Sequence, residues 1–438
     1  MHRKEFIKNT SLAAAGITIL NFPVFGKNAP SNKVVIAVMG VNGRGGFHAE
    51  SFSKLPNVEV GYICDVEENA IANCMKRFAT ADKKPIVIKD IRELLNKKDF
   101  DGLSIAAPDH WHTPATLLAL AHGKHVYVEK PCGQNPYEGE LLVEAMNKYP
   151  KQVIQMGNQR RSFQKLIDAA QQVREGVIGN AYFGKAWYTN NRKSIGVGKK
   201  IPVPQTLDFE LWQGPAPRKD YQDNLVHYNW HWFWHWGTAE TCNNATHEVD
   251  CCRWFLNVDY PTKVSSAGGR YAFKDDWQTP DTQTASFEFG NNKSISWEGR
   301  SCNNYPAEGA GRGFIIYGDK GTLVNLSNDD YKIFDYDNKL IKEVKESVAG
   351  NGANTISANG DLDNFHFENF VEAVRGNRKV ISPIVEGHKS VLLCHLANIA
   401  QRTGRTLHCD PTNGHILNDA DAMKLWRRDY EKGWEPKV

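Results

Sequence analysis

The chain has 438 residues and 41% hydrophobic content, so it can bury a substantial core, and its length suggests two or three domains. Its net charge of +3 is small for this size and it has no long run of lysine or arginine, which argues against nucleic acid as a partner. Nine cysteines at irregular spacing define neither a disulfide framework nor a zinc site.

The first thirty residues are predicted to be a targeting segment. Arg3, Lys4 and Lys8 give a basic start, and a mostly apolar stretch over 12–25 follows. This stretch is too short to span a bilayer comfortably, which favours a signal peptide over a membrane anchor. Residues 3–8 resemble a twin-arginine signal with Lys4 in place of the second arginine. We expect residues 1–30 to direct export to the periplasm. The alternative is an uncleaved N-terminus on a cytoplasmic protein.

From residue 32 onward, short apolar stretches alternate with amphipathic ones. Strands are predicted at 34–39, 58–64, 102–107, 125–128 and 153–156, and helices at 46–55, 67–79, 113–121 and 137–148. Alternation at this spacing implies a parallel sheet with helices on both faces. Ligands of such sheets bind at the carboxyl ends of the strands.

The first strand-to-helix turn carries the main cofactor signal. It reads Gly40-Val41-Asn42-Gly43-Arg44-Gly45-Gly46, a Gly-x-Gly-x-x-Gly fingerprint with Asn42 at the second glycine. Asparagine tolerates left-handed backbone, and the helix that follows would point its free N–H groups at a pyrophosphate. Asp65 ends the second strand, where a carboxylate holds the adenosine ribose. Because this carboxylate would repel a further phosphate, we expect NAD rather than NADP. The alternative is a glycine-rich turn without a ligand. The candidate cofactor residues here are Gly40, Asn42, Gly43, Arg44, Gly45 and Asp65.

Two later strand ends add polar side chains beside the expected nicotinamide half of the cofactor. One reads Pro108-Asp109-His110-Trp111-His112, and the other reads Glu129-Lys130-Pro131. Lys130, placed at a strand terminus, is predicted to be functional rather than a solvated surface residue. The cofactor-binding candidates from these strand ends are Pro108, His110, Trp111, His112, Glu129 and Lys130.

The second half of the chain has a different pattern. Strand-like stretches recur at 181–187, 284–289, 294–297, 313–317 and 321–324, and helices are predicted at 364–375 and 387–402. The turn at 318–321 is typical of a hairpin. Residues 189–223, rich in glycine, proline and lysine, are predicted to form a long irregular loop of the kind that is often functional in enzymes.

The segment 230–237 reads Trp-His-Trp-Phe-Trp-His-Trp-Gly. In an extended conformation all four tryptophans would share one face, whereas in a helix His231 and His235 would have the spacing of a metal pair. No carboxylate or cysteine pattern supports a metal site, so we expect no metal. A sugar-stacking or core role is preferred, with Trp234 and His235 as substrate-binding candidates.

Together, the glycine-rich turn, the Pro-Asp-His-Trp-His segment and the Glu-Lys-Pro triplet resemble the glucose-fructose oxidoreductase, inositol dehydrogenase and rhizopine-catabolism (Gfo/Idh/MocA) family. The resemblance continues through 155–161, 211–215, 368–370 and 394–398, so it covers nearly everything after residue 32. It implies an NAD-binding Rossmann domain over 31–156. It further implies an α/β domain with a large, mostly antiparallel open sheet over 157–438, which binds substrate and forms a homodimer or homotetramer.

The same resemblance implies the catalytic residues. Many members have an aspartate and a histidine four residues apart after the tryptophan-rich segment, and the histidine acts on the substrate hydroxyl. By resemblance His247 is catalytic here and Asn243 replaces the aspartate. On a helix this spacing places both side chains on one face. Because aspartate is the commoner family residue, we expect Asn243→Asp to be tolerated.

Oxidising a secondary alcohol requires a base for the hydroxyl proton while hydride leaves the same carbon. An ordinary histidine pKa near 6.5 suits His247 to that work, and the Lys130 ammonium can stabilise a developing alkoxide. Family members differ on which of the two takes the proton. Glu129 is expected to orient Lys130. The further substrate-binding candidates are Asn158, Gln159 and Arg160.

Three functions remain open. The leading one is an NAD-dependent dehydrogenase of a sugar or glycoside, with carbon 3 as one candidate position. The second is a glycosidase that recycles NAD through oxidation and elimination, as the related glycoside hydrolase family 109 does. The third, a non-catalytic sugar-binding protein, is disfavoured by the intact Lys130 and His247.

Overall fold

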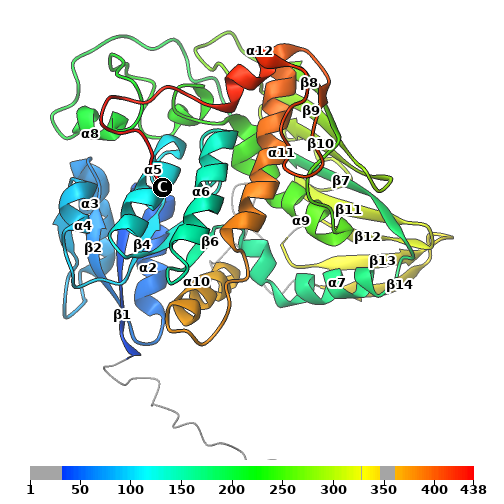
Figure 1. Cartoon of the computed structure of the whole chain (residues 1–438), viewed down its shortest axis with the longest axis horizontal. Coiled ribbons are helices and arrows are strands. Elements are labelled where there is room, and N and C mark those ends of the chain that lie inside the picture. Colours follow the sequence, from blue (N-terminus) through cyan, green and yellow to red (C-terminus); the bar gives the residue numbers. More distant parts are fainter. Residues whose placement is uncertain (1–31, 327, 346–360) are drawn as a thin grey trace, which may run out of the picture.

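A computed structural model describes residues 32–326, 328–345 and 361–438, so the predicted targeting segment over 1–30 lies outside the described residues. A helix-covered parallel sheet occupies one end of the molecule and a larger sheet occupies the other (Figure 1). Within the described ranges, no helix combines the length and apolarity needed to cross a bilayer.

The first sheet is parallel throughout, in the order β3-β2-β1-β4-β5-β6. Its strands are β1 (Val34–Met39), β2 (Val58–Cys64), β3 (Ile86–Ile88), β4 (Gly102–Ile105), β5 (His125–Val128) and β6 (Ile154–Met156). The helices between them are α2 (Arg44–Lys54), α3 (Glu68–Met75), the 3-10 turn η2 (Lys76–Phe78), α4 (Ile91–Leu95), α5 (Asp109–Ala121) and α6 (Pro136–Lys148). The order reverses between β1 and β4, the place where such sheets bind ligands. The predicted dinucleotide-binding architecture is confirmed.

Helix α5 begins at Asp109, four residues before the predicted start at 113. Pro114 therefore lies inside the helix and cannot donate to the carbonyl of His110. Arg428, from the C-terminal tail, donates to that carbonyl from Nη2 at 2.7 Å. Asp109 in the first turn is favourably placed toward the helix dipole. These contacts hold the amino end of α5 at the edge where the ligand is expected.

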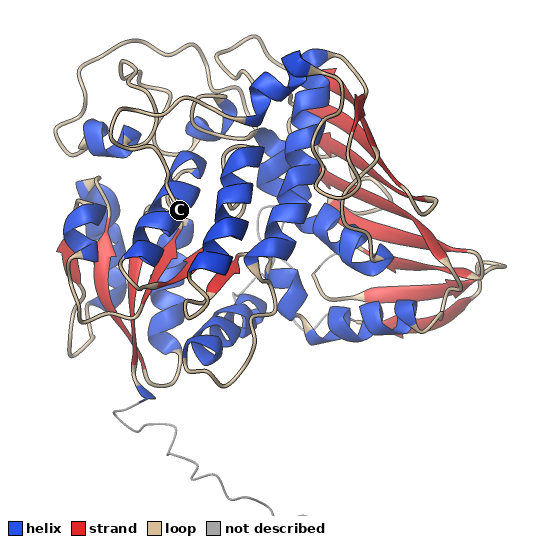
Figure 2. Cartoon of the chain, in the orientation of Figure 1, coloured by secondary structure: helices blue, strands red, loops and turns tan. Residues whose placement is uncertain are grey.

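The second sheet has nine strands in the order β14-β13-β12-β11-β7-β10-β9-β8-β15, and neighbours are antiparallel except β7 and β10. Its strands are β7 (Ala181–Thr189), β8 (Lys263–Gly269), β9 (Thr282–Phe289), β10 (Lys293–Arg300), β11 (Arg312–Gly318), β12 (Gly321–Asn325), β13 (Tyr331–Asp335), β14 (Leu340–Val344) and β15 (Leu407–His408). The mostly antiparallel sheet is confirmed. The helices α7 (Gln164–Arg174), α9 (Thr246–Leu256) and α11 (Ile384–Thr403) lie on one of its faces (Figure 2).

The remaining helices and turns lie between the two sheets or beside them. They are the 3-10 turns η3 (Gln159–Ser162), η4 (Asn229–Trp232) and η6 (Lys424–Trp426), the π-helical turn η5 (Thr241–Ala245), and the helices α8 (Phe209–Gln213), α10 (Asp361–Val374) and α12 (Ala420–Met423). The long predicted loop after β7 contains α8 and crosses over the carboxyl edge of the first sheet.

Helix α10 belongs by sequence to the stretch assigned to the second domain, but it packs on the first. Its Phe367, Phe370 and Val371 share a buried core with Ile36 and Phe52 of β1 and α2. Each such apolar side chain stabilises the packing by roughly 1.5–3 kcal/mol. The chain therefore returns to the core of the first domain after leaving it, while His366 of α10 also bonds to Ser162 of η3 at 2.6 Å.

Candidate active site

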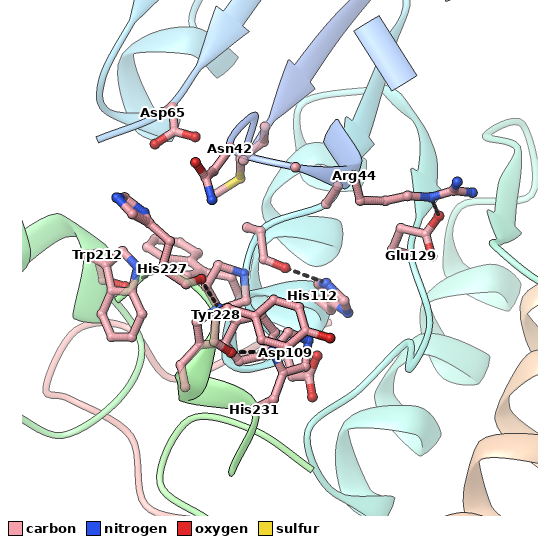
Figure 3. A pocket seen from close by; sticks show the side chains of 18 of the residues that line it. Asn42, Arg44, Asp65, Asp109, His112, Glu129, Trp212, His227, Tyr228 and His231 are labelled. Atoms are coloured by element: carbon pink, nitrogen blue, oxygen red, sulfur yellow. Dashed lines mark hydrogen bonds and ion pairs between the residues drawn. The ribbon is translucent and has the colours of Figure 1, made fainter. Parts of the chain in front are cut away.

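A cavity of about 340 Å³ lies at the carboxyl ends of β1, β4 and β5, between the two domains. Figure 3 shows Asp65, Asn42 and His227 at one part of the cavity, and Tyr228, Asp109 and His231 gathered at another. Both domains contribute to its wall, so the site exists only when they are packed together.

The glycine-rich turn is shaped for close backbone approach. Gly40 has φ +78°, and a Cβ there would lie 2.5 Å from the backbone of Ala107. A Cβ on Gly45 would lie 1.8 Å from the carbonyl oxygen of Gly40, whereas one on Gly43 would meet nothing within 4 Å. Helix α2 starts after Gly43 with no side-chain cap and no acidic residue in its first turn. Its amino end can therefore receive an anion. Gly45 itself does not line the cavity and acts through packing.

Asp65 ties this turn to the end of β2. One carboxylate oxygen accepts from the N–H of Val41 at 2.6 Å, and the other accepts from the N–H groups of Val66 (2.7 Å) and Glu67 (3.0 Å). Burial raises the pKa of Asp65, and these three donors oppose that effect. A carboxylate has about four acceptor positions, so one remains for a ribose hydroxyl.

Lys130, at the end of β5, meets the second domain. Its Nζ donates to the backbone oxygen of Asn243 at 2.7 Å and to the side-chain Oδ1 of Asn243 at 2.9 Å. Burial lowers the pKa of Lys130, and the neighbouring carboxylates Glu129 and Asp109 oppose that effect. Residues 113 positions apart in the sequence thus meet in one cavity wall.

Glu129 does not orient the Lys130 amine as expected. Its Oε1 accepts from Arg44 Nε at 2.9 Å and from Gln159 Nε2 at 3.0 Å, and it lies 3.0 Å from His48 Nε2. Burial would raise the pKa of Glu129, but Arg44 and His48 hold it well below its usual range. Its Oε2 accepts from the backbone N–H of Lys130 at 3.2 Å, whereas the Lys130 amine is held by Asn243.

Asn243 lies in the π-helical turn η5, and His247 lies in the first turn of α9, rather than in the single regular helix expected. Single π turns inside helices frequently mark functional sites. Both residues line the cavity. Asn243 Nδ2 donates to Glu240 Oε1 at 3.2 Å, so an aspartate there would face a carboxylate. This contact argues against the expected tolerance of Asn243→Asp.

His247 is 5% exposed, and its Nδ1 is buried with no hydrogen-bond partner among the residues that the structure describes. Burial holds the pKa of His247 well below its usual range, and the charges of Lys130, Arg312 and Arg160 lower it further. The imidazole is therefore neutral at neutral pH.

His112 and His110, both on α5, have different surroundings. His112 lines the cavity, but its ring nitrogens contact the carbonyl oxygens of Pro131 (2.6 Å) and Ala107 (2.7 Å), so it braces two strand ends. His110 does not line the cavity, because its ring packs against Trp212 and its Nε2 lies 3.0 Å from the Trp212 carbonyl oxygen. The prediction for His110 is wrong. The other cofactor candidates that line the cavity are Gly40, Asn42, Gly43, Arg44, Asp65, Pro108, Trp111, Glu129 and Lys130.

Among the predicted substrate residues, Gln159 and His247 line the cavity. Arg160 is instead buried in an ion pair with Glu248 at 3.2 Å, so its guanidinium lies inside the second domain rather than at the cavity. Asn158 is 1% exposed and lies outside the cavity wall. The predictions for these two residues are wrong.

The tryptophan-rich segment is neither an extended strand nor a regular helix. It begins in η4 and continues through turns, so its side chains diverge. Trp230 lines the cavity, Trp232 stacks on Trp277 with centroids 4.0 Å apart, and Trp234 lies against Arg402. His235 bonds to the Pro217 carbonyl oxygen at 2.7 Å. Trp234 and His235 therefore do not reach the cavity, contrary to prediction.

Several cavity residues were not singled out from the sequence. They are Arg192, Trp212, His227, Tyr228 and Asn244, together with Asp109 and His231, which lie in the sequence motifs but were not assigned to the cofactor or substrate. Most of them follow β7, in or just after the stretch expected to be a functional loop. Backbone bonds fasten that stretch to the first domain, from Glu68 N to Thr206 O (2.9 Å) and from Asp208 N to Val66 O (3.0 Å). Length and composition predicted that this loop is functional, but which of its side chains reach the cavity depends on the fold.

Comparison with known proteins gives two family matches. Residues 34–157 match the model described as "Oxidoreductase family, NAD-binding Rossmann fold", and residues 206–408 match "Oxidoreductase family, C-terminal alpha/beta domain".

Curated relatives include glycosyl hydrolase family 109 protein 1 of Shewanella sp. (strain MR-4), which is 30% identical over 211 residues. The alpha-N-acetylgalactosaminidase of Shewanella oneidensis is 28% identical over 211 residues. Each match covers 43% of this chain and 46% of the relative, so the chain spans about half the length of the curated relatives it matches.

Solved structures share the fold. A levoglucosan dehydrogenase in complex with NADH and levoglucosan has a TM-score of 0.65 at 16% identity, covering 86% of this chain and 99% of that one. A myo-inositol dehydrogenase from Lactobacillus casei in complex with NAD(H) and myo-inositol has a TM-score of 0.62 at 17% identity, covering 90% and 100%.

Proposed function

The chain belongs to the Gfo/Idh/MocA family of NAD-binding oxidoreductases, and we propose that it transfers hydride between NAD and a secondary hydroxyl of a sugar or glycoside. The observation that carries this proposal is the meeting of Lys130, Asn243 and His247 in one wall of the interdomain cavity. Carbon 3 is the candidate position.

The cavity fits a dinucleotide. The uncapped amino end of α2 and the open space at Gly43 suit a pyrophosphate, and Asp65 retains an acceptor position for a ribose hydroxyl. Pro108, Trp111 and Lys130 line the part of the cavity beside β4 and β5. NAD bound here supplies the hydride acceptor.

We assign the hydroxyl proton to Lys130. A neutral amine can donate two N–H groups to the two oxygens of Asn243 and still offer a lone pair, and the ammonium formed afterwards keeps the same bonds. Protonating His247 would instead create a buried N–H without an acceptor, near three cationic side chains. His247 accordingly hydrogen-bonds the reacting oxygen as a neutral imidazole.

The test is to incubate the purified protein and NAD with a panel of sugars and glycosides, following NADH absorbance and product mass. A dehydrogenase gives NADH together with a product two mass units lighter. No NADH and no change in product mass across the panel would contradict the proposal.

A second candidate is a glycosidase that recycles NAD, which the 30% identity to family 109 proteins favours. Oxidation at carbon 3 would acidify the neighbouring C–H, elimination would cleave the glycosidic bond, and reduction would restore the hydroxyl. The same panel distinguishes the two candidates, because this cycle releases free sugar from a glycoside with no net NADH.

Asp65 should make NAD bind at least about tenfold more tightly than NADP, because a 2′-phosphate would add negative charge beside its carboxylate. Titration of both nucleotides into the apo protein measures the ratio of the NADP and NAD dissociation constants. Asp65→Ala should bring this ratio closer to one. Asp101 provides the control: its carboxylate accepts from the N–H of Val35 but does not line the cavity, so Asp101→Ala should keep the parental ratio. Equal or tighter NADP binding to the parent would contradict this assignment.

We also propose export to the periplasm through residues 1–30, on the basis of their basic start and short apolar stretch. Protein recovered from its native cell should lack these residues and fractionate with the periplasm. Intact mass decides this, and a full-length cytoplasmic species would refute export. By family resemblance, we further propose a homodimer or homotetramer formed through the open face of the second sheet.

A further inference from the structure

Glu240 is a buried carboxylate next to the active-site wall but outside the cavity itself. It directly precedes the π-helical turn η5 and is 4% exposed. Nothing in its sequence context marked it as functional. Its partners, however, lead directly to Lys130.

Glu240 fixes the amide of Asn243. Asn243 Nδ2 donates to Glu240 Oε1 at 3.2 Å, and Asn244 Nδ2 donates to the same oxygen. An amide whose nitrogen faces a carboxylate must turn its oxygen the other way, and that oxygen accepts from Lys130 Nζ at 2.9 Å. The carboxylate therefore opposes the flipped form of the Asn243 amide, in which the side-chain oxygen would face Glu240 and the nitrogen would face Lys130.

The carboxylate is itself held rigidly. Arg192 donates to it from Nε at 2.5 Å and from Nη2 at 3.2 Å, and Arg192 Nη1 donates to Tyr228 Oη at 2.9 Å. Burial would raise the pKa of Glu240, but Arg192 holds it below its usual range. Glu240 therefore carries a fixed negative charge two hydrogen bonds away from the Lys130 amine.

We propose that Glu240 is a positioning residue, which acts through Asn243 to place the Lys130 amine and to set the pH at which that amine gives up its proton. The proposal rests on the proposed role of Lys130 in the reaction. Loss of the carboxylate removes a negative charge that favours the ammonium, so Lys130 should lose its proton at a lower pH.

The groups that face Lys130 come from several packed elements, and they include both signs of charge. They are Arg44 of α2, Asp109 of α5, Glu129 of β5's carboxyl end, His231 of η4, Glu240 before η5 and His247 of α9. Glu240 differs from the other carboxylates in this set because it is joined to Lys130 by a side-chain relay rather than by sequence proximity or by the cavity wall.

The test follows Lys130 directly in the apo protein, labelled with 13C at lysine Cε, with the resonance assigned by its absence in Lys130→Arg. In Glu240→Gln the titration midpoint of Lys130 should fall by about half a pH unit or more relative to the parent. Glu386→Gln is the matched control, because it removes a carboxylate that also pairs with an arginine, Arg253, but whose other ion-pair partners are Arg161 and Lys389 rather than the Asn243 relay. It should leave the midpoint unchanged.

A midpoint within error of the parent in folded Glu240→Gln, or an equal fall in Glu386→Gln, would overturn the proposal. Because Glu240→Gln leaves Arg192 buried and unpaired, it could fail to fold. In that event Arg192→Gln combined with Glu240→Gln is compared with Arg192→Gln alone, because these two proteins differ only in the Glu240 carboxylate, and the same fall in the Lys130 midpoint is expected between them. Since the titration uses neither substrate nor cofactor, its outcome is independent of whether the protein oxidises sugars.

Discussion

Replacing Lys130 with alanine should lower turnover by about a hundredfold or more, which is the usual size of a general-base contribution. The amine is held by two oxygens of Asn243 in the cavity wall, and alanine would leave this position without a proton acceptor. The rise of turnover with pH that a base produces should also disappear. Steady-state kinetics across a pH series, on whichever sugar or glycoside the panel identifies, measures both effects.

Lys124 gives the matched control for this variant. It is another buried lysine of the first domain, and its Nζ donates to the carbonyl oxygen of Phe100 at 2.6 Å, away from the cavity. Lys124→Ala should keep the parental pH profile, whatever it does to stability. If Lys130→Ala retains near-normal turnover with an unchanged profile, the proton acceptor is not Lys130.

The strongest sequence patterns predicted the first domain well. In β1, Val34, Ile36 and Val38 enter one core while Ala37 and Met39 enter the core on the opposite face, so the strand reads as a continuous apolar run. Such runs, spaced by amphipathic helices, determine a parallel sheet. The short edge strand β3 was missed, because Ile86–Ile88 is largely exposed and is defined by backbone pairing to β2. The same reason applies to β14, the largely exposed strand at one edge of the second sheet.

The sheet against which a helix packs is harder to predict than the helix itself. Residues 364–375 were predicted as a helix, and α10 is there. Its apolar face could have covered either sheet, and nothing in a helical period says which one. The contacts that decide it, such as Phe367 against Phe52, join residues more than three hundred positions apart.

The same limit on prediction from sequence applies to the residues of the active site. Local motifs were sufficient to identify Asp65, Lys130 and Asn243, because each lies at a strand end or in a family segment. They could not separate His110 from His112, since only the packing of α5 against α8 turns one ring away from the cavity. Nor could they reveal that Arg160 is neutralised by Glu248, 88 positions later.

Replacing His247 with alanine should also reduce turnover by about a hundredfold, for a different reason. The imidazole is neutral and lies in the same wall as Lys130, so it can hydrogen-bond the reacting oxygen as charge develops there, and loss of one such bond costs about 10²–10³ in rate. Because Lys130 remains, the rise of turnover with pH should persist in His247→Ala. NAD affinity should change much less, since His247 lies in the second domain, away from the glycine-rich turn.

The pH profile is what separates this role from that of a base. If His247 took the proton, its removal would abolish the pH-dependent limb. His388 is the matched control: it is a buried histidine of α11 outside the cavity wall, whose pKa burial lowers to about 3, and His388→Ala should leave turnover near the parental value. Lys130→Ala combined with His247→Ala should lose less than the product of the single effects, because both side chains act on one oxygen. Near-normal turnover in His247→Ala would mean that this imidazole only fills the wall, and that Lys130 acts on the hydroxyl without it.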